Sequence, residues 1–213
     1  RQPAPIDTVI QPALSSAGHA PVSLHQQLQQ RAADGRPIRV GLIGAGKFGS
    51  MYLAQVPRTP GVHLAAIADL SPDNARANLQ RVGWQAERVA ATSIDDAIKS
   101  GTTHVGDDWQ ALVRHPAIDV VVECTGHPIA AVDHCLAAFA SAKHVVNVTV
   151  EADAFCGPLL ARRAHEAGVV YSLAFGDQPA LICGLVDWAR TCGFPVVAAG
   201  RGHKWLPHFC EST

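Results

Sequence analysis

The sequence predicts an α/β fold, a doubly wound and mostly parallel sheet with an N-terminal helical arm, and three observations support this prediction. Short apolar runs alternate with segments of helical spacing from residue 37 onward. Residues 118–124, IDVVVEC, are apolar almost throughout, as expected for a central strand that is buried on both faces. A glycine-rich turn joins the first strand of the series to its first helix.

The expected elements follow in order along the chain. Residues 1–22 are rich in proline and lack periodicity, which predicts an irregular arm. Ser23 and Gln26 form a capping-box pattern, which predicts a short helix that ends near Gly35. Strands are expected at residues 38–43, 62–68, 103–105, 118–124, 144–148, 169–174 and 195–199. Helices are expected at residues 47–56, 72–81, 128–141, 157–167 and 180–192, with shorter capped helices at 93–101 and 107–116.

The turn after the first strand carries the pattern GxGxxG. Gly44 allows the tight turn, Gly46 lets the backbone approach a pyrophosphate at the helix N-terminus, and Gly49 permits close contact between helix and sheet. With Lys47 and Phe48 of the same turn, these glycines are the expected contacts of a Rossmann-type dinucleotide site. The alternative is a glycine-rich turn that holds no ligand.

Asp69 ends the second strand, 20 residues after Gly49. A carboxylate at this position accepts hydrogen bonds from the adenosine ribose, which favours NAD. Ser71 and Arg76 lie close in sequence and can hold the 2′-phosphate of NADP, so both dinucleotides stay open. The alternative for Asp69 is a structural role, in which it supports the N-terminus of the helix at 72–81 that Ser71 is expected to cap.

The turns after later strands are further candidates, since ligands lie at the carboxyl ends of the strands in an open parallel sheet. Cys124, Thr125 and Gly126 end or follow the fourth strand, and we expect them to pass near the nicotinamide ribose. His127 is either a general acid or a polar residue that starts the next helix.

Two carboxylates follow the fifth strand in the run Val150, Glu151 and Asp153. This turn can contact the carboxamide of the nicotinamide, position substrate or hold a divalent cation, since carboxylates are hard oxygen ligands. The same side chains can equally cap the helix expected at 157–167.

Five stretches of the chain together resemble a known family: VGLIGAGKFGSMYLAQVPRTPGV, DVVVECTGHP, KHVVNVTVEAD, GPLLARRAHEAGVVYSLAFGDQPAL and VVAAGRG. Over about residues 37–207 the chain resembles the homoserine dehydrogenase-like oxidoreductases that carry a C-terminal SAF-type domain. This group includes the 1-deoxy-D-xylulose 5-phosphate reductoisomerase-like enzyme of isoprenoid synthesis. The resemblance implies an NAD(P)-dependent oxidoreductase in which a Rossmann domain precedes a substrate and oligomerisation domain.

The resemblance divides the chain into three expected segments. Residues 1–36 are the arm with its short helix, residues 37–200 the NAD(P)-binding Rossmann domain, and residues 201–213 the start of the substrate and oligomerisation domain. The resembled families continue beyond this point. We therefore expect that the chain is truncated and has little turnover of its own. The full-length protein is expected to be a homo-oligomer.

The resemblance also implies roles for residues near the end of the chain. Asp177 falls on an acidic metal ligand of the reductoisomerases, in a loop that lies beside the substrate in homoserine dehydrogenases. The second acidic position is Phe175, and the lysine that follows the fifth strand in both relatives is replaced by Val150 and Glu151. Lys204 follows the last expected strand and can donate a proton or bind a phosphate or carboxylate. Asp177 and Lys204 are thus the candidate catalytic residues, and the weak candidates for metal ligands are Glu151, Asp153 and Asp177.

The expected reaction is hydride transfer between nicotinamide and a small polar carbonyl or alcohol substrate, such as a sugar phosphate or sugar acid. The alternatives are homoserine dehydrogenase activity, deoxyxylulose-phosphate reductoisomerase activity and a non-catalytic dinucleotide-sensing module. Three carboxylates at neighbouring turns disfavour the sensor, since sensing needs only phosphate and ribose contacts.

Composition bounds the partners and the compartment. The 17 Lys and Arg nearly balance the 18 Asp and Glu, so no strong field attracts nucleic acid or an anionic membrane. No apolar run is long enough to span a bilayer. The six cysteines form no CxxC pair, which favours free thiols in a reducing compartment and predicts a cytoplasmic protein. The expected partner is a small-molecule substrate.

Overall fold

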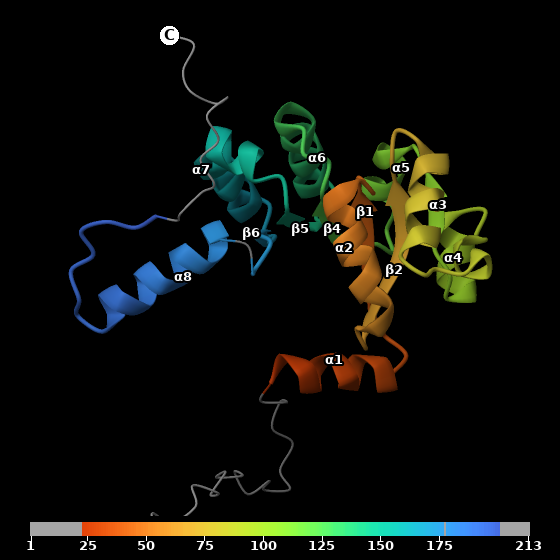
Figure 1. Cartoon of the computed structure of the whole chain (residues 1–213), viewed down its shortest axis with the longest axis horizontal. Coiled ribbons are helices and arrows are strands. Elements are labelled where there is room, and N and C mark those ends of the chain that lie inside the picture. Colours follow the sequence, from red (N-terminus) through yellow and green to blue (C-terminus); the bar gives the residue numbers. More distant parts are fainter. Residues whose placement is uncertain (1–22, 177, 201–213) are drawn as a thin grey trace, which may run out of the picture.

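The structure, a computed structural model, describes residues 23–176 and 178–200 and is built on one sheet (Figure 1). Its six strands are all parallel, in the order β3-β2-β1-β4-β5-β6. The order runs outward in both directions from β1, as in a Rossmann fold, and confirms the predicted fold class. The strands are β1 (Ile38–Ile43), β2 (Val62–Ala68), β3 (His104–Gly106), β4 (Val120–Glu123), β5 (His144–Asn147) and β6 (Tyr171–Leu173).

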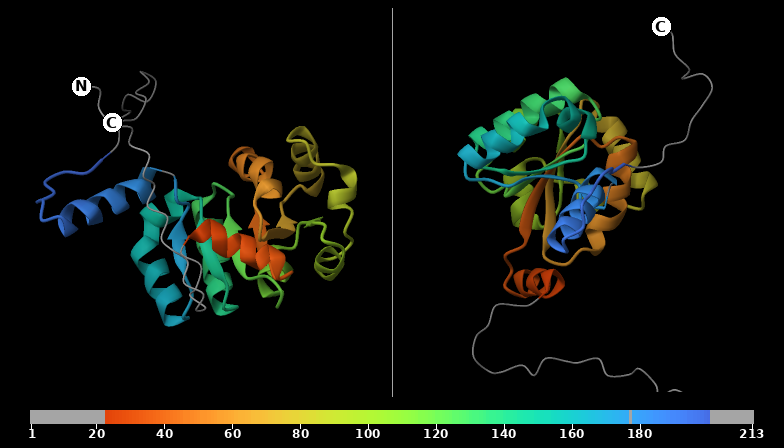
Figure 2. Two further views of the ribbon diagram at one scale, coloured as in Figure 1. Left: turned by 90° about the horizontal axis from the view of Figure 1, so that it is seen from below. Right: turned by 90° about the vertical axis from the view of Figure 1, so that its left-hand side faces the viewer.

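Helices cover both faces of the sheet (Figure 2). Helices α2 and α3 lie on one face, and α4, α5, α6 and α7 pack on the other. The helices are α1 (Leu24–Ala33), α2 (Lys47–Gln55), α3 (Pro72–Arg81), α4 (Ile94–Ser100), α5 (Trp109–Arg114), α6 (Pro128–Ala140), α7 (Val150–Glu166) and α8 (Gln178–Thr191). Two short 3₁₀ helices, η1 (Val56–Arg58) and η2 (Ala86–Val89), join them. None of the helices that the structure describes has the length and apolar character of a membrane span.

The core consists of two apolar clusters, one on each face of the sheet. Successive strand residues point to opposite faces, so Leu42 packs in the cluster under α2 and α3, whereas Ile43 packs in the cluster under α5, α6 and α7. Val121 and Val122 of the central strand β4 divide in the same way. Burial on both faces explains why the sequence of this strand is apolar almost throughout.

Helix α7 begins earlier than the sequence predicts. It starts at Val150, not at residue 157, and contains a break at Cys156, whose φ of −147° and ψ of 28° are not helical. Gly157 and Pro158 follow this break. Proline fits the first turn of a helix because it has no N–H to donate. The Gly-Pro step therefore marks the second of two helical segments, and the first segment contains Glu151 and Asp153.

The strand expected at 195–199 does not form within the described residues. Helix α8 projects away from the sheet beyond the edge strand β6, and the segment that follows it does not return to that edge (Figure 1). Pro195 lacks the N–H that a sheet needs, and Val197 is 96% exposed. An apolar run forms a strand only where a neighbouring strand pairs with it, and none does so here.

Candidate dinucleotide site

The glycine turn between β1 and α2 is closely packed at two of its three glycines. Gly44 has a φ of +92°, and a Cβ on it would lie 2.8 Å from the carbonyl oxygen of Cys124. A Cβ on Gly49 would lie 2.7 Å from the carbonyl oxygen of Gly44. Gly46 differs, because a Cβ there would have no atom within 4 Å. Gly46 is also the N-cap of α2 and offers no side-chain cap, so the first amides of α2 face open space that suits an anion.

Three side chains hold this turn in place. Asp69 Oδ2 accepts a hydrogen bond from the Ala45 amide at 2.8 Å. Asn78 Nδ2 donates to the Ala45 carbonyl at 2.9 Å, and Ser50 Oγ donates to the Gly46 carbonyl at 2.9 Å. The turn is thus fixed before any ligand binds. The sequence analysis did not identify Asn78, because its contact from α3 to the glycine turn has no local sequence pattern.

Asp69 accepts a second backbone hydrogen bond through its other oxygen, from the Ser71 amide at 2.9 Å. Ser71 is the N-cap residue of α3 as predicted, but its hydroxyl makes no capping hydrogen bond, and Asp69 supports the start of α3 instead. Each carboxylate oxygen has a further lone pair, so both can still accept from ribose hydroxyls.

Arg76 Nη2 donates to the Val105 carbonyl at 2.9 Å, which occupies part of the guanidinium that a 2′-phosphate would need.

Two cavities meet at the glycine turn. The larger, of about 440 Å³, lies on the side of Asp69, and the smaller, of about 280 Å³, lies on the side of β5 and α7. Gly46, Cys124 and Thr125 line both. The larger is also lined by Ile43, Gly44, Ala68, Asp69, Leu70, Asp107, Trp109, His127, Ala130 and His134. The smaller is also lined by Lys47, Phe48, Gly126, Val148, Thr149, Val150 and Glu151.

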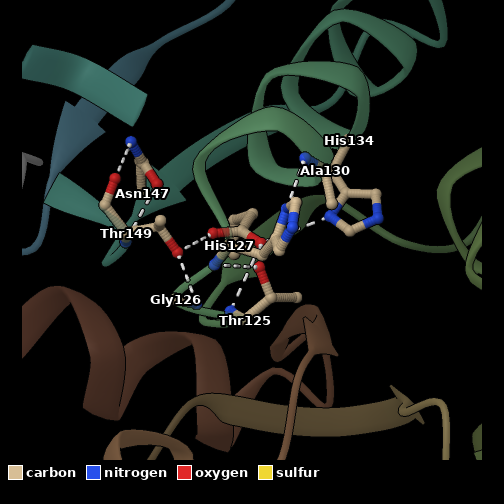
Figure 3. Close-up of polar contacts among 8 residues, drawn as sticks. Thr125, Gly126, His127, Ala130, His134, Asn147 and Thr149 are labelled. Atoms are coloured by element: carbon tan, nitrogen blue, oxygen red, sulfur yellow. Dashed lines mark hydrogen bonds and ion pairs between the residues drawn. The ribbon is translucent and has the colours of Figure 1, made fainter. Parts of the chain in front are cut away.

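Glu123, the last residue of β4, is buried at the centre of a polar cluster with Thr125, His134 and Thr149, three residues that Figure 3 labels. Its side chain is fully buried, at 0% exposure. Oε1 accepts from the Thr125 hydroxyl at 2.6 Å and lies 3.2 Å from Nδ1 of His134, and Oε2 accepts from the Thr149 hydroxyl. The sequence analysis did not identify Glu123 as a site residue. The signal that could have identified it is a single glutamate at the end of an apolar strand.

A second set of hydrogen bonds connects β5 to α7. Asn147 Oδ1 accepts from the Thr149 amide at 3.0 Å, and Asn147 Nδ2 donates to the Tyr171 hydroxyl at 3.0 Å. Tyr171 donates in turn to Asp153 Oδ1 at 3.0 Å, and burial raises the pKa of this tyrosine above its ordinary value. Asp153 is therefore held toward the sheet, whereas Glu151 is exposed beside the smaller cavity. Across the described part of the chain, no three His, Cys, Asp or Glu side chains gather as metal ligands.

The other predicted site residues fall in three groups. His127 Nδ1 accepts from the Ala130 amide at 3.3 Å, as a residue that starts a helix does. Burial, followed by the charge of Glu123, raises the pKa of Cys124 to about 12, so this thiol is protonated and unreactive at neutral pH. Asp177 and Lys204, the candidate catalytic residues, lie outside the described residues.

Comparison with known proteins identifies the family. A family model described as "Oxidoreductase family, NAD-binding Rossmann fold" (GFO/IDH/MocA) matches residues 38–151, more than half of the chain. The chain belongs to this oxidoreductase family. A second model, described as the catalytic domain of oxidoreductase DRL, matches residues 176–213. No curated protein gives a significant match.

Solved structures share the fold of this chain. An NAD-binding oxidoreductase from Klebsiella pneumoniae is 22% identical with a TM-score of 0.52, over 74% of this chain and 39% of that one. A homoserine dehydrogenase from Thiobacillus denitrificans is 25% identical with a TM-score of 0.50, over 64% of this chain and 29% of that one. The chain thus spans well under half the length of these structures.

Replacing Gly49 with alanine is expected to lower the free energy of unfolding by about 1–3 kcal/mol, because the new methyl group overlaps the Gly44 carbonyl. Urea denaturation measures the change. Gly184→Ala in α8 is the matched control, since a Cβ there meets no atom within 4 Å and alanine favours the helix. Equal midpoints for Gly49→Ala and the wild type would mean that α2 does not pack on the turn in this way.

Proposed function

We propose that this protein binds NAD(H) across its glycine turn. The observation that carries the proposal is the pair of cavities that meet at Gly46, beside the free N-terminal amides of α2. The pyrophosphate lies at those amides, the adenosine occupies the cavity of Asp69, and the nicotinamide ribose and ring extend toward Thr125 and Glu151. Membership of the NAD-binding family supports this orientation, in which the two nucleotide halves lie on opposite sides of β1.

NAD is the preferred dinucleotide in this proposal. Asp69 places a carboxylate in the larger cavity, where a 2′-phosphate would meet its negative charge. Arg76, the nearby cation that could neutralise such a phosphate, is engaged with the carbonyl of Val105. Ribose hydroxyls can instead donate to the free lone pairs of the Asp69 carboxylate.

The reaction that we propose is hydride transfer to or from a small polar carbonyl or alcohol, such as a sugar phosphate or sugar acid. The bound nicotinamide supplies the hydride chemistry. The chain binds and orients that ring through Thr125, Gly126 and Val150, and Asp177 and Lys204 move the substrate proton. The match of residues 176–213 to the catalytic domain of oxidoreductase DRL supports these two assignments, since both residues lie in the matched range.

A second domain begins at about residue 176 in this proposal, earlier than the boundary at 201 that the sequence predicts. Helix α8 leaves the sheet, and its Leu185 and Trp188 are exposed. An exposed apolar face of this kind is typical of a surface that another domain or subunit covers. The substrate and oligomerisation domain that the sequence resemblance implies is the expected cover.

Asp69→Ala tests the proposed cofactor and its orientation. We expect the affinity for NADH to fall about tenfold and the affinity for NADPH less than threefold, since only NADH loses two ribose hydrogen bonds to a carboxylate. Calorimetric titration measures both constants. The variant also frees the Ala45 and Ser71 amides, an effect common to both dinucleotides, so the ratio of the two losses is the test.

Asp73→Ala is the matched control, because Asp73 is an exposed carboxylate in the first turn of α3 and lines neither cavity. Equal losses of NADH and NADPH in Asp69→Ala would remove Asp69 from the ribose. Hydride transfer is tested with sugar phosphates, sugar acids and homoserine, by the absorbance of the dihydronicotinamide. Binding of NADH without oxidation of any of these substrates would favour the dinucleotide sensor.

A further inference from the structure

The buried carboxylate of Glu123 has more hydrogen-bond donors around it than its place in a core strand requires. Thr125 offers its hydroxyl at 2.6 Å and its amide at 3.3 Å, the Thr149 hydroxyl reaches the other oxygen, and His134 Nδ1 lies at 3.2 Å. These donors come from the β4–α6 turn, the β5–α7 turn and α6. One side chain thus joins three elements at the carboxyl edge of the sheet.

The two threonine hydroxyls connect this carboxylate to the backbone of the β4–α6 turn. Thr149 Oγ1 accepts from the Gly126 amide at 3.0 Å, and Thr125 Oγ1 accepts from the His127 amide at 3.2 Å. A hydroxyl has one hydrogen, and each hydroxyl gives it to Glu123. Each oxygen therefore turns its lone pairs toward an amide of the turn.

We propose that Glu123 is a positioning residue for the nicotinamide half of the dinucleotide. It acts through Thr125 and Thr149, whose hydroxyls accept from the amides of His127 and Gly126 and so fix the backbone on both sides of Gly126, which lines the smaller cavity. This inference rests on the proposed function, which places the nicotinamide in that cavity. Gly126 and Thr149 line only the smaller cavity, whereas the proposed function places the adenosine half at Asp69 in the larger one, so the adenosine half does not contact the Gly126 backbone.

Glutamine at position 123 disturbs this arrangement with little change in volume. Its amide nitrogen is a donor and has no lone pair to offer. Whichever way the amide turns, one of the threonine hydroxyls loses its acceptor and must direct its hydrogen elsewhere. The turn then loses a fixed acceptor for one of its amides.

The test compares NADH with ADP, which lacks the nicotinamide nucleoside. Calorimetric titration of Glu123→Gln is expected to show an affinity for NADH about tenfold below the wild type and an affinity for ADP within twofold of it, since hydrogen bonds to a charged group have this magnitude. The matched control is Thr103→Val. It removes a buried hydroxyl that donates to the Leu64 carbonyl at 2.6 Å, and it is expected to leave both affinities unchanged.

Thr149 supplies a second route to the same answer if Glu123→Gln does not fold. Thr149→Val removes the connecting hydroxyl and should weaken NADH selectively, whereas Thr149→Ser keeps the hydroxyl and should restore binding. Adding Thr149→Val to Glu123→Gln should cost little more, because both changes act on one path.

Equal losses of NADH and ADP, or no loss of either, would overturn the positioning role. A wild-type protein that binds ADP as tightly as NADH would also overturn it, because the nicotinamide half would then contribute nothing. Failure of the wild type to bind either ligand would instead overturn the proposed function itself.

Discussion

Glu123→Ala is expected to lower the free energy of unfolding by about 3–5 kcal/mol, the usual cost when one partner of a buried charged network is removed. The side chain is fully buried and accepts from Thr125, Thr149 and His134. Alanine leaves these donors without their acceptor, and each buried donor that stays unpaired adds to the cost. Urea denaturation followed by circular dichroism measures the loss.

Glu166→Ala is the control for this effect. Glu166 is an exposed carboxylate on α7 that pairs with Arg163 at 3.1 Å, and an exposed pair of this kind contributes about 0–1 kcal/mol. A Glu123→Ala protein as stable as Glu166→Ala would show that the carboxylate does not hold the three elements together.

Gly46→Asp is expected to reduce the affinity for NADH at least about a hundredfold, since a carboxylate beside the α2 N-terminus repels the pyrophosphate and fills its place. The fold is expected to tolerate the change. Gly46 has an extended backbone conformation, a Cβ there meets no atom within 4 Å, and aspartate is a favourable N-cap. Calorimetry measures the affinity, and urea denaturation shows whether the stability is kept.

Asp108 offers the comparison within the same protein, because it already serves as the N-cap of α5 through its bond to the Ala111 amide at 2.8 Å. Asp108→Ala should lower stability by about 1 kcal/mol and leave NADH binding intact. If Gly46→Asp bound NADH like the wild type, the phosphates would not lie at the start of α2.

Six of the seven strands expected from the sequence form in the structure, because a short apolar run is a local pattern. The glycine turn is also a local pattern, and its Gly44 and Gly49 make contacts that only glycine allows. The strand expected at 195–199 would need a partner strand, which is a matter of tertiary structure. The start of α7 was placed too late because a Gly-Pro step usually begins a helix, whereas here it follows a break inside one.

The polar connections of the site are less visible in the sequence. Glu123 and His134 meet because α6 folds back over the end of β4, and Asn78 reaches Ala45 from α3. Such contacts join residues with no common spacing. The roles of Asp177 and Lys204 stay predictions.

The central claim is that a nicotinamide dinucleotide binds across Gly46, and titration of the wild-type protein with NADH tests it most directly. Trp109 lines the larger cavity, so we expect bound NADH to quench its emission. If the claim holds, NADH gives saturable quenching of tryptophan fluorescence, ADP-ribose competes with it, and the signal is lost in Gly46→Asp. An unchanged tryptophan emission with no saturable binding at millimolar NADH would contradict it.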